Sequence, residues 1–324
     1  MRRIILPLIA VLACLGFAQT AAAQAWPSRP IRIVVVFPPG GSSDIVARVL
    51  AEALTARLNQ RVVVDNRPGA GGTLGAAHVA QQPADGYTLM LSNTAPITSG
   101  PPTYPNVAYD PVAGFTHIAY LGATPLVVVA NRALVPATDL AGLVAWVKAQ
   151  SSPPGFGSSG AGSVAHIAGT MFERQAGAAL THVPYRGSSP MQADLLAGNI
   201  PIAFDTLPQN VDHIREGRLR AFAVTARARE PMAPDVPTTA EAGLPALLIE
   251  NWLGLSGPTG LPAEIADRLH AETVAALGTP ALRERMDQYG IRQRPMTRAE
   301  FNAFVAEDVR EIGGMVRALG ITAR

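Results

Sequence analysis

The sequence predicts an α/β protein of two lobes, each a mainly parallel sheet flanked by helices. The first observation is an alternation, from residue 31 to residue 225, of short β-branched runs with longer segments of helical periodicity. The second is length, because roughly 300 residues of this kind form two α/β domains more often than one. The third is composition: 48% of the 324 residues are hydrophobic and 15% are charged, which is too apolar for a disordered chain.

The first part of the chain shows the alternation clearly. Residues 31–37 are a β-branched run typical of a buried parallel strand. A helix is predicted over 44–58, because Ile45, Val49 and other apolar residues fall on one stripe. The next predicted elements are a strand at 62–64, a glycine loop at 69–75, a helix that ends at 78–82 and a strand at 87–91.

The middle of the chain repeats the pattern and the end departs from it. A strand at 126–130 precedes a helix that Thr138 caps and that runs to about residue 150. Beyond about residue 262 the pattern is helical only, and Thr297 with Glu300 forms a capping box for a last helix to about residue 319. The elements between are strands at 155–159, 182–185, 200–204 and 219–225, and helices at 164–174, 191–197 and up to 216.

Two strand-like segments, at 118–125 and 247–258, are the candidate crossings between lobes. No Ser/Gly-rich or charged linker separates two halves of the chain. Two crossings predict a discontinuous first lobe of residues 26–123 and 250–324, and a second lobe of residues 124–249. The architecture we expect is a hinge with a cleft between the lobes.

Charge and cysteine content exclude several classes of function. The formal net charge is +2, and it comes from Arg2 and Arg3; without them the basic and acidic residues are equal in number. This balance disfavours a nucleic-acid or anionic-membrane binder. The single Cys excludes a disulfide framework, and the six scattered His include no compact metal motif. We therefore expect no metal site.

Residues 1–25 have the pattern of a signal peptide. Arg2 and Arg3 form a basic start, residues 4–17 are apolar, and small residues at 21–25 offer a cleavage site. The apolar run is shorter than the roughly 20 residues of a spanning helix, so we favour export over the alternative, a retained membrane anchor. Cys14 follows Val11-Leu12-Ala13 as in a lipoprotein, but the apolar run continues past it. We interpret it as part of the removed segment.

A glycine loop at 37–44 joins a predicted strand to a predicted helix. Such a junction presents unpaired backbone N–H groups and the positive end of the helix dipole. Its two glycines allow close approach to the backbone, and Ser42 adds a hydroxyl, so a carboxylate could bind without Lys or Arg. The alternative is a tight βα turn with a serine cap.

A second loop, at 157–163, has the same form in the second lobe. Two such loops facing each other across a cleft could hold the two ends of one small ligand, which favours the anion-binding interpretation. The run Gly155-x-Gly157-x-x-Gly160 also fits a dinucleotide fingerprint. We reject that interpretation because no long strand precedes it and no acidic residue ends a second strand about 20 positions on. No cofactor is expected.

Enzyme signatures are weak, and no catalytic residue is assigned. The nucleophile elbow, the His-Glu-x-x-His motif and the Walker loop are absent. Asp205 follows the strand at 200–204, where it could accept a hydrogen bond from a ligand or cap the next helix. We interpret His166 as a packing residue. Arg186 could pair with a carboxylate or be solvated, and the sequence leaves both open.

Several motifs together resemble the Bug receptors, the TctC-like solute-binding proteins of tripartite tricarboxylate transporters. The resemblance spans nearly all of the chain after residue 25, and the set of motifs is specific. The matching runs are 26–32 (WPSRPIR), 37–41 (FPPGG), 65–72 (DNRPGAGG), 83–89 (PADGYTL), 157–163 (GSSGAGS) with His166, 182–187 (HVPYRG) and 235–243 (DVPTTAEAG). Arg186 stands where many members have Lys, and Ala161 where other small or polar residues occur.

The resemblance implies a periplasmic-binding-protein (Venus flytrap) fold in the periplasm. It also implies capture of a small carboxylate, whether a mono-, di- or tricarboxylate, an amino acid or an aromatic acid, and its delivery to a membrane permease. The implied ligand-binding residues are Phe37, Pro38, Pro39, Gly40, Gly41, Ser42, Ser92, Asn93, Thr94, Ser158, Ser159, Gly160, Ala161, Gly162, Ser163, Asp205 and Thr206. We expect a monomer.

Two other functions are compatible with the same fold. A receptor could signal to a membrane sensor kinase without transport, in which case deletion of the gene would abolish induction rather than uptake. An exported α/β enzyme would turn its ligand over. We favour the binding protein, because no nucleophile or acid–base pair has a convincing spacing.

Overall fold

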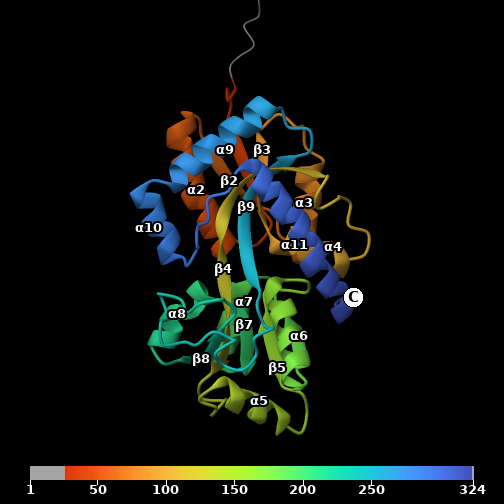
Figure 1. The fold of residues 1–324 in the computed structure, drawn as a ribbon, viewed down its shortest axis with the longest axis vertical. Helices are drawn as coiled ribbons and strands as arrows, with labels where there is room; N and C mark the ends of the chain where they lie inside the picture. The colour runs from red at the N-terminus through yellow and green to blue at the C-terminus, as the bar shows by residue number, and fades with distance from the viewer. Residues whose placement is uncertain (1–25, 323–324) are drawn as a thin grey trace, which may run out of the picture.

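The computed structural model describes residues 26–322, arranged as two lobes along the long axis of the molecule (Figure 1). The predicted signal peptide, residues 1–25, lies outside the described residues. Among the helices of residues 26–322, none combines the length and apolarity needed to cross a membrane.

The upper lobe in Figure 1 is built from both ends of the described chain. Its strands β1, β2 and β3 pair in parallel in the order β2-β1-β3. Its elements are β1 (Ile31–Val35), α2 (Ser42–Leu58), β2 (Val62–Asn66), a 3-10 turn η1 (Ala70–Gly72), α3 (Thr73–Ala80), β3 (Thr88–Asn93), a π-helical turn η2 (Ala95–Ser99), α4 (Gly100–Thr103), α9 (Ala263–Leu277), α10 (Pro280–Gln288) and most of α11 (Arg298–Leu319).

The lower lobe is built from the middle of the chain. Its strands β6, β5 and β7 also pair in parallel. Its elements are α5 (Leu140–Lys148), β5 (Gly155–Ser158), α6 (Val164–Ala176), β6 (Thr181–Pro184), α7 (Ser188–Ala197), β7 (Ile202–Thr206), α8 (Leu207–Arg215) and β8 (Leu219–Val224).

Two long strands, β4 (Phe115–Asn131) and β9 (Glu250–Pro258), join the lobes. The first half of β4 pairs with β9 beside the upper sheet, and its second half pairs with β7 and β8 in the lower sheet. At about 3.3 Å per residue, the 17 residues of β4 span roughly 55 Å, enough to run from one lobe into the other. All strands of residues 26–322 thus belong to one continuous sheet of nine.

Each half of the sheet buries both of its faces. Along β1, Ile33 and Val35 pack on one face while Val34 packs on the other. Along β4, Val128 and Val127 alternate in the same way between two clusters of the lower lobe. Alternation of this kind follows from the two-residue period of a strand, and burial on both faces explains the uninterrupted apolar runs in the sequence.

The crossing segment of β4 is irregular. Its register against β9 shifts between His117 and Ala119 and again between Tyr120 and Gly122. Gly122 has φ +145°, and a Cβ there would lie 2.7 Å from the carbonyl oxygen of Arg292. Bulges and a glycine allow a strand to bend locally, so β4 can bend here on its way between the lobes.

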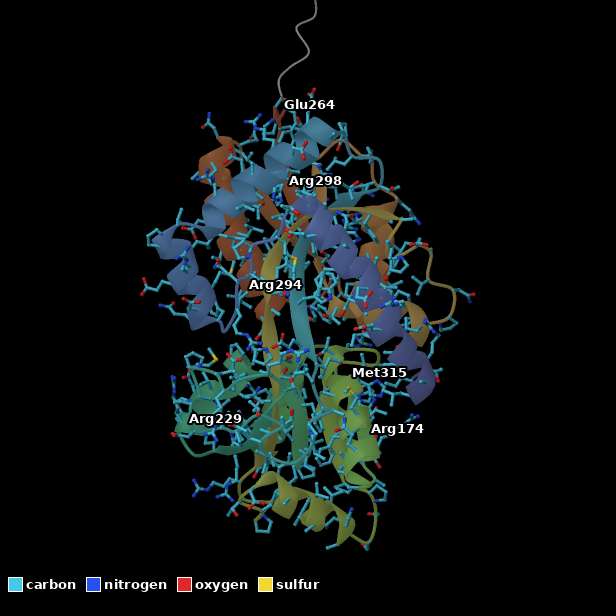
Figure 2. The ribbon with its side chains drawn as sticks, in the orientation of Figure 1. Arg174, Arg229, Glu264, Arg294, Arg298 and Met315 are labelled. Atoms are coloured by element: carbon cyan, nitrogen blue, oxygen red, sulfur yellow. The ribbon has the colours of Figure 1, made fainter. Side chains whose placement is uncertain are left out.

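The C-terminal helix α11 contacts both lobes. Phe301 and Val305 pack in the upper core, whereas Val316 belongs to a lower-lobe cluster. Figure 2 shows Met315 near the junction with α6, and Arg174 of α6 donates a hydrogen bond to the carbonyl oxygen of Ala318 at 3.0 Å. α11 therefore braces the two lobes, and it also packs against β4, where Phe301 and Phe304 contact Tyr120.

Three local predictions differ from the structure. The sheet is less parallel than expected: four of its eight strand pairs are antiparallel, and each of these includes β4 or β9. Asp139, not Thr138, caps α5 by accepting from the amide of Gly142 at 2.7 Å. The glycine loop at 69–75 is shorter, since α3 begins at Thr73. Gly75 lies inside this helix, where a Cβ would be 2.7 Å from the carbonyl oxygen of Arg67.

Candidate functional site

A cavity of about 180 Å³ lies between the lobes, where the carboxyl ends of β1 and β7 meet the first turns of several helices. The carboxyl ends of strands are where open α/β sheets bind ligands. The wall comes from both lobes: Phe37, Pro38, Pro39, Gly41, Ser42, Ser43, Ala95 and Asn251 on one side, and Leu126, Ser159, Ser163, Val164, Ala165, Arg186, Gly187, Ser188, Ser189, Pro190, Asp205 and Thr206 on the other.

Four helices begin at this cavity, and three of them lack a side-chain cap. The N-caps of α2, α7 and α8 are Gly41, Gly187 and Thr206, and none of these accepts a hydrogen bond from its own helix through a side chain. The N-cap of α6, Ser163, accepts from the amide of His166 at 3.2 Å. Uncapped first turns carry unpaired N–H groups and the positive ends of the helix dipoles. This wall therefore favours a small anion.

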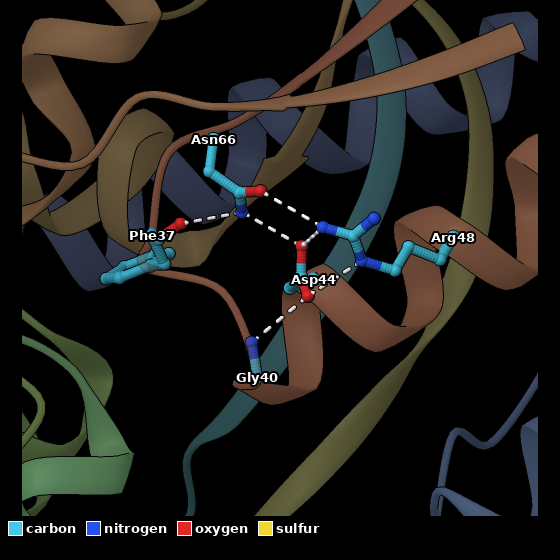
Figure 3. Close-up of polar contacts among 5 residues, drawn as sticks. All are labelled: Phe37, Gly40, Asp44, Arg48 and Asn66. Atoms are coloured by element: carbon cyan, nitrogen blue, oxygen red, sulfur yellow. Dashed lines mark hydrogen bonds and ion pairs between the residues drawn. The ribbon is translucent and has the colours of Figure 1, made fainter.

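The first glycine loop is held by the carboxylate of Asp44, as Figure 3 shows. Asp44 accepts from the amide of Gly40 at 3.0 Å, from Nε and Nη2 of Arg48 at 3.0 Å each, and from Nδ2 of Asn66 at 2.9 Å. The same Nδ2 donates to the carbonyl oxygen of Phe37 at 3.1 Å. Burial raises the pKa of Asp44, but these hydrogen bonds and the Arg48 charge outweigh burial and lower it below its usual value.

Because of this network, Gly40 and Gly41 have different roles in the loop. The amide of Gly40 is already paired with Asp44, Gly40 does not line the cavity, and its φ of +86° marks the turn of the loop. Gly41 lines the cavity, and a Cβ there would meet only the carbonyl oxygen of Pro38, at 3.9 Å. From the sequence we expect a ligand to approach the backbone closely at both glycines. The structure leaves room for this at Gly41.

The second loop is supported by two stacked histidines. The rings of His166 and His182 lie 3.6 Å apart at 7°. Nδ1 of His166 accepts from the amide of Gly162 at 3.2 Å, and Nε2 of His182 forms a 2.7 Å hydrogen bond with Oγ of Ser158. Burial lowers the pKa of His166 to about 4 and that of His182 to about 3, with a further contribution from the neighbouring ring at His182. Both rings are thus neutral near pH 7, and they pack behind the loop.

Asp205 is buried at the wall of the cavity. One of its oxygens accepts from Oγ of Ser188 at 2.7 Å and the other from Nδ2 of Asn210 at 3.1 Å. The N-cap of α8 is the next residue, Thr206, so the carboxylate of Asp205 does not occupy the N-cap position. Burial raises its pKa to about 6, against the lowering effect of these hydrogen bonds. Its charge therefore changes close to neutral pH.

Three expected ligand-binding residues, Ser92, Asn93 and Thr94, are buried behind the cavity. Ser92 pairs with Ser256 of β9 at 2.8 Å, and Oγ1 of Thr94 accepts from the amide of Trp252 at 3.0 Å. Nδ2 of Asn93 donates to Ser43, which does line the cavity, at 3.3 Å. Direct ligand contact by these three residues stays a prediction.

The other expected residues divide between two cavities. A second cavity of about 470 Å³ adjoins the first and includes Gly160, Ala161 and the glycine loop at 68–72. Ser158 and Gly162, like Gly40, line neither cavity. The sequence prediction missed the first turn of α7, although Gly187-Ser188-Ser189-Pro190 repeats the glycine–serine pattern of the other two loops. Proline in a first helical turn is a further signal of a helix start there.

Hydrogen bonds join the two lobes across the cleft. The hydroxyl of Tyr104 donates to the carbonyl oxygen of Ala161 at 2.7 Å, and Oγ of Ser99 donates to the carbonyl oxygen of Gly162. The hydroxyls of Ser42 and Thr206, also from opposite lobes, are 3.1 Å apart. These hydrogen bonds exist only when the lobes are together, so they favour the closed arrangement.

Tyr104→Phe should shift the lobes toward an open arrangement. One neutral hydrogen bond contributes about 1 kcal/mol, so the open-to-closed ratio should rise about fivefold. Residues 26–324 contain no Cys, so spin labels at Ala56→Cys and Ser151→Cys would report the interlobe distance. Tyr109→Phe is the matched control, because the hydroxyl of Tyr109 donates to the carbonyl oxygen of Pro96 within the upper lobe. Equal distance distributions for Tyr104→Phe and its control would contradict this prediction.

Within residues 26–322, no three His, Cys, Asp or Glu side chains gather closely enough to hold a metal ion. The site is instead a cavity between two α/β lobes, bounded by serine hydroxyls and uncapped helix starts from both. This combination defines a two-lobed solute-binding protein of the Venus flytrap type.

Comparison with known proteins gives the family. Residues 46–321 match the sequence profile of the tripartite tricarboxylate transporter family receptor, and the chain belongs to this family, which includes the Bug proteins. Protein BugT of Bordetella pertussis is 36% identical over 310 residues, covering 95% of each chain. The periplasmic binding protein BugD is 31% identical with a TM-score of 0.86, covering 92% of this chain and all of its own. An R. palustris protein solved with adipate is 30% identical with a TM-score of 0.87 and the same coverage. The family is one of binding proteins and not of enzymes.

Proposed function

We propose that this protein is a periplasmic receptor that captures a small carboxylate in the interlobe cleft and delivers it to a tripartite tricarboxylate-type permease. One observation supports the ligand class above all: three uncapped helix starts, from α2 in one lobe and α7 and α8 in the other, share a single cavity. The solved relative with adipate supports the same class. In this proposal residues 1–25 direct export and are then removed.

In this proposal the ligand bridges two lobes, residues 26–123 with 250–324 and residues 124–249. A ligand that contacts both lobes binds the closed arrangement better than the open one, and this difference drives closure. The direct contacts we propose are the expected residues that line the first cavity: Phe37, Pro38, Pro39, Gly41, Ser42, Ser159, Ser163, Asp205 and Thr206.

Native mass spectrometry of purified residues 26–324, followed by a thermal-shift screen of mono-, di- and tricarboxylates, tests the ligand class. A ligand at 100 times its Kd stabilises the folded state by about 2.7 kcal/mol. A bound acid should therefore raise Tm by at least about 5 °C. The proposal is refuted if no acid co-purifies with the protein and no carboxylate of the screen raises its Tm. Loss of uptake of the identified acid on deletion of the gene tests delivery to a permease.

The affinity for a carboxylate should rise as the pH falls from 7.5 to 5.5. The pKa of Asp205 is about 6 in the free protein, and an anion bound beside it favours its protonated form, so binding takes up a proton. We expect a three- to tenfold decrease in Kd, because one proton changes Kd by at most about tenfold per pH unit.

Asp205→Asn is the control for this pH dependence. It keeps the side-chain shape and removes the titration, so its Kd should be flat over the same range apart from any titration of the ligand itself. A wild-type affinity that instead rises with pH would mean that the ligand donates a hydrogen bond to the ionised carboxylate. Titration calorimetry at three pH values distinguishes the two results.

A further inference from the structure

The two interlobe cavities are adjacent and share part of their walls. Phe37 and Pro38 from the upper lobe and Ser159, Arg186 and Gly187 from the lower lobe line both of them. At this boundary the lobes nearly touch, because a Cβ on Gly187 would lie 3.4 Å from the ring of Pro38. The segment 186–187 therefore lies across the cleft between the two cavities.

The first cavity is too small to be the whole site for an elongated ligand. Its volume of about 180 Å³ is below the ~300 Å³ at which pockets for small molecules usually begin. The second cavity, of about 470 Å³, adds the glycine loop at 68–72 and Tyr104. A ligand whose carboxylate occupies the helix starts of the first cavity can extend into the second.

The charges along this path are few. Among the described residues that line the first cavity, Arg186 and Asp205 are the charged ones, and Arg186 is the one charged residue of the second. The oxygens of Asp205 accept from Ser188 and Asn210. Arg186 is exposed, and none of the ion pairs or side-chain hydrogen bonds within residues 26–322 involves it.

A guanidinium with no protein carboxylate beside it retains its whole set of five donors for a ligand. Its planar fork matches a carboxylate, with which it forms paired hydrogen bonds. The far end of a ligand held by the helix starts would reach this guanidinium where the cavities join.

We propose that Arg186 and the second cavity form a subsite for a second carboxylate, so that the ligand is an elongated dicarboxylate. This assignment rests on the proposed receptor function and adds to it the class of acid and the residue that selects it. The helix starts of α2, α7 and α8 bind one carboxylate, the apolar Phe37 and Pro38 contact the chain of the ligand, and Arg186 binds the other carboxylate.

Titration calorimetry with paired acids of equal chain length tests the assignment. The pairs are succinate with butyrate, adipate with hexanoate, and suberate with octanoate, so that members of a pair differ only in the second carboxylate. At least one diacid should bind the wild type tenfold or more tightly than its monoacid. Arg186→Gln should lose at least ten times more affinity for that diacid than for the monoacid, and Arg186→Lys should retain part of the preference. Arg227→Gln is the matched control, since Arg227 is an exposed residue of the lower lobe that lines neither cavity.

The possible results separate the subsite from the receptor function. If monoacids bind as tightly as diacids, or if Arg186→Gln keeps the diacid preference, the Arg186 subsite is wrong while the carboxylate receptor stands. If no acid of the panel binds the wild type, the receptor for linear carboxylates is refuted and the subsite with it. Thermal denaturation of each variant confirms folding, which substitution of an exposed side chain should leave unchanged.

Discussion

Gly41→Val should strongly weaken ligand binding in a protein that remains folded. Gly41 lines the first cavity at the start of α2, and its φ of −81° is accessible to any residue. The space beside its Cα is open, so a valine side chain would fill the place of the ligand rather than collide with the protein. Overpacking of this size costs about 1–3 kcal/mol, which corresponds to a loss of affinity of roughly 5- to 150-fold.

Titration calorimetry with the tightest acid of the panel measures this loss. The control is Gly314→Val on α11, where a Cβ would meet only the guanidinium of Arg317, at 3.9 Å. The control should bind as the wild type does. Retained affinity in a folded Gly41→Val protein would overturn the assignment of the first glycine loop to the carboxylate.

Asp44→Ala should destabilise the protein by about 2–3 kcal/mol and also weaken ligand binding. The side chain of Asp44 is 5% exposed and its carboxylate accepts four hydrogen bonds, so its removal leaves the donors of Gly40, Arg48 and Asn66 unpaired. Because Arg48 is 55% exposed, water replaces part of its contribution, which keeps the loss below that of a fully buried ion pair. The expected decrease in Tm is about 5–10 °C.

Differential scanning calorimetry measures the stability of this variant, and Glu52→Ala is its matched control. Glu52 lies on the same helix and pairs with Arg285, but its side chain is 73% exposed, so its loss should cost less than about 0.5 kcal/mol. Asp44→Asn should fall between the two, because it keeps an acceptor and loses the charge. Equal stability of Asp44→Ala and Glu52→Ala would show that the network does not hold the loop.

Local sequence patterns predicted most of the elements. Most of the predicted strands lie within three residues of their expected ends, because burial on both faces leaves an uninterrupted apolar run. The strand expected at 126–130 is instead the second half of β4, which begins at Phe115. Thr297 and Glu300 form the predicted capping box at the start of α11. The crossing expected at 118–125 lies within β4, and the crossing expected at 247–258 overlaps β9. The two-lobed fold that the crossings predicted is confirmed by the solved relatives.

Long-range contacts account for what the sequence did not predict. Whether the amide of Gly40 is free depends on Asp44, whose position is fixed in part by Asn66 from the next strand. Whether Ser92 and Thr94 face the cleft depends on β9, which pairs with β3 from far along the chain. Periodicity predicts which face of α11 is apolar but not that its end packs against the lower lobe.

The position of β9 in the sheet has a consequence for how the protein folds. β9 lies between β3 and β4, so the upper half of the sheet is incomplete until Glu250–Pro258 has been synthesised. Until then β3 and β4 present open edges, which are prone to pair with other chains. The lower lobe, by contrast, comes from one continuous stretch and can form early, whereas pairing between distant segments is slow. During translation, the half of the molecule that is begun first is therefore the half that is completed last.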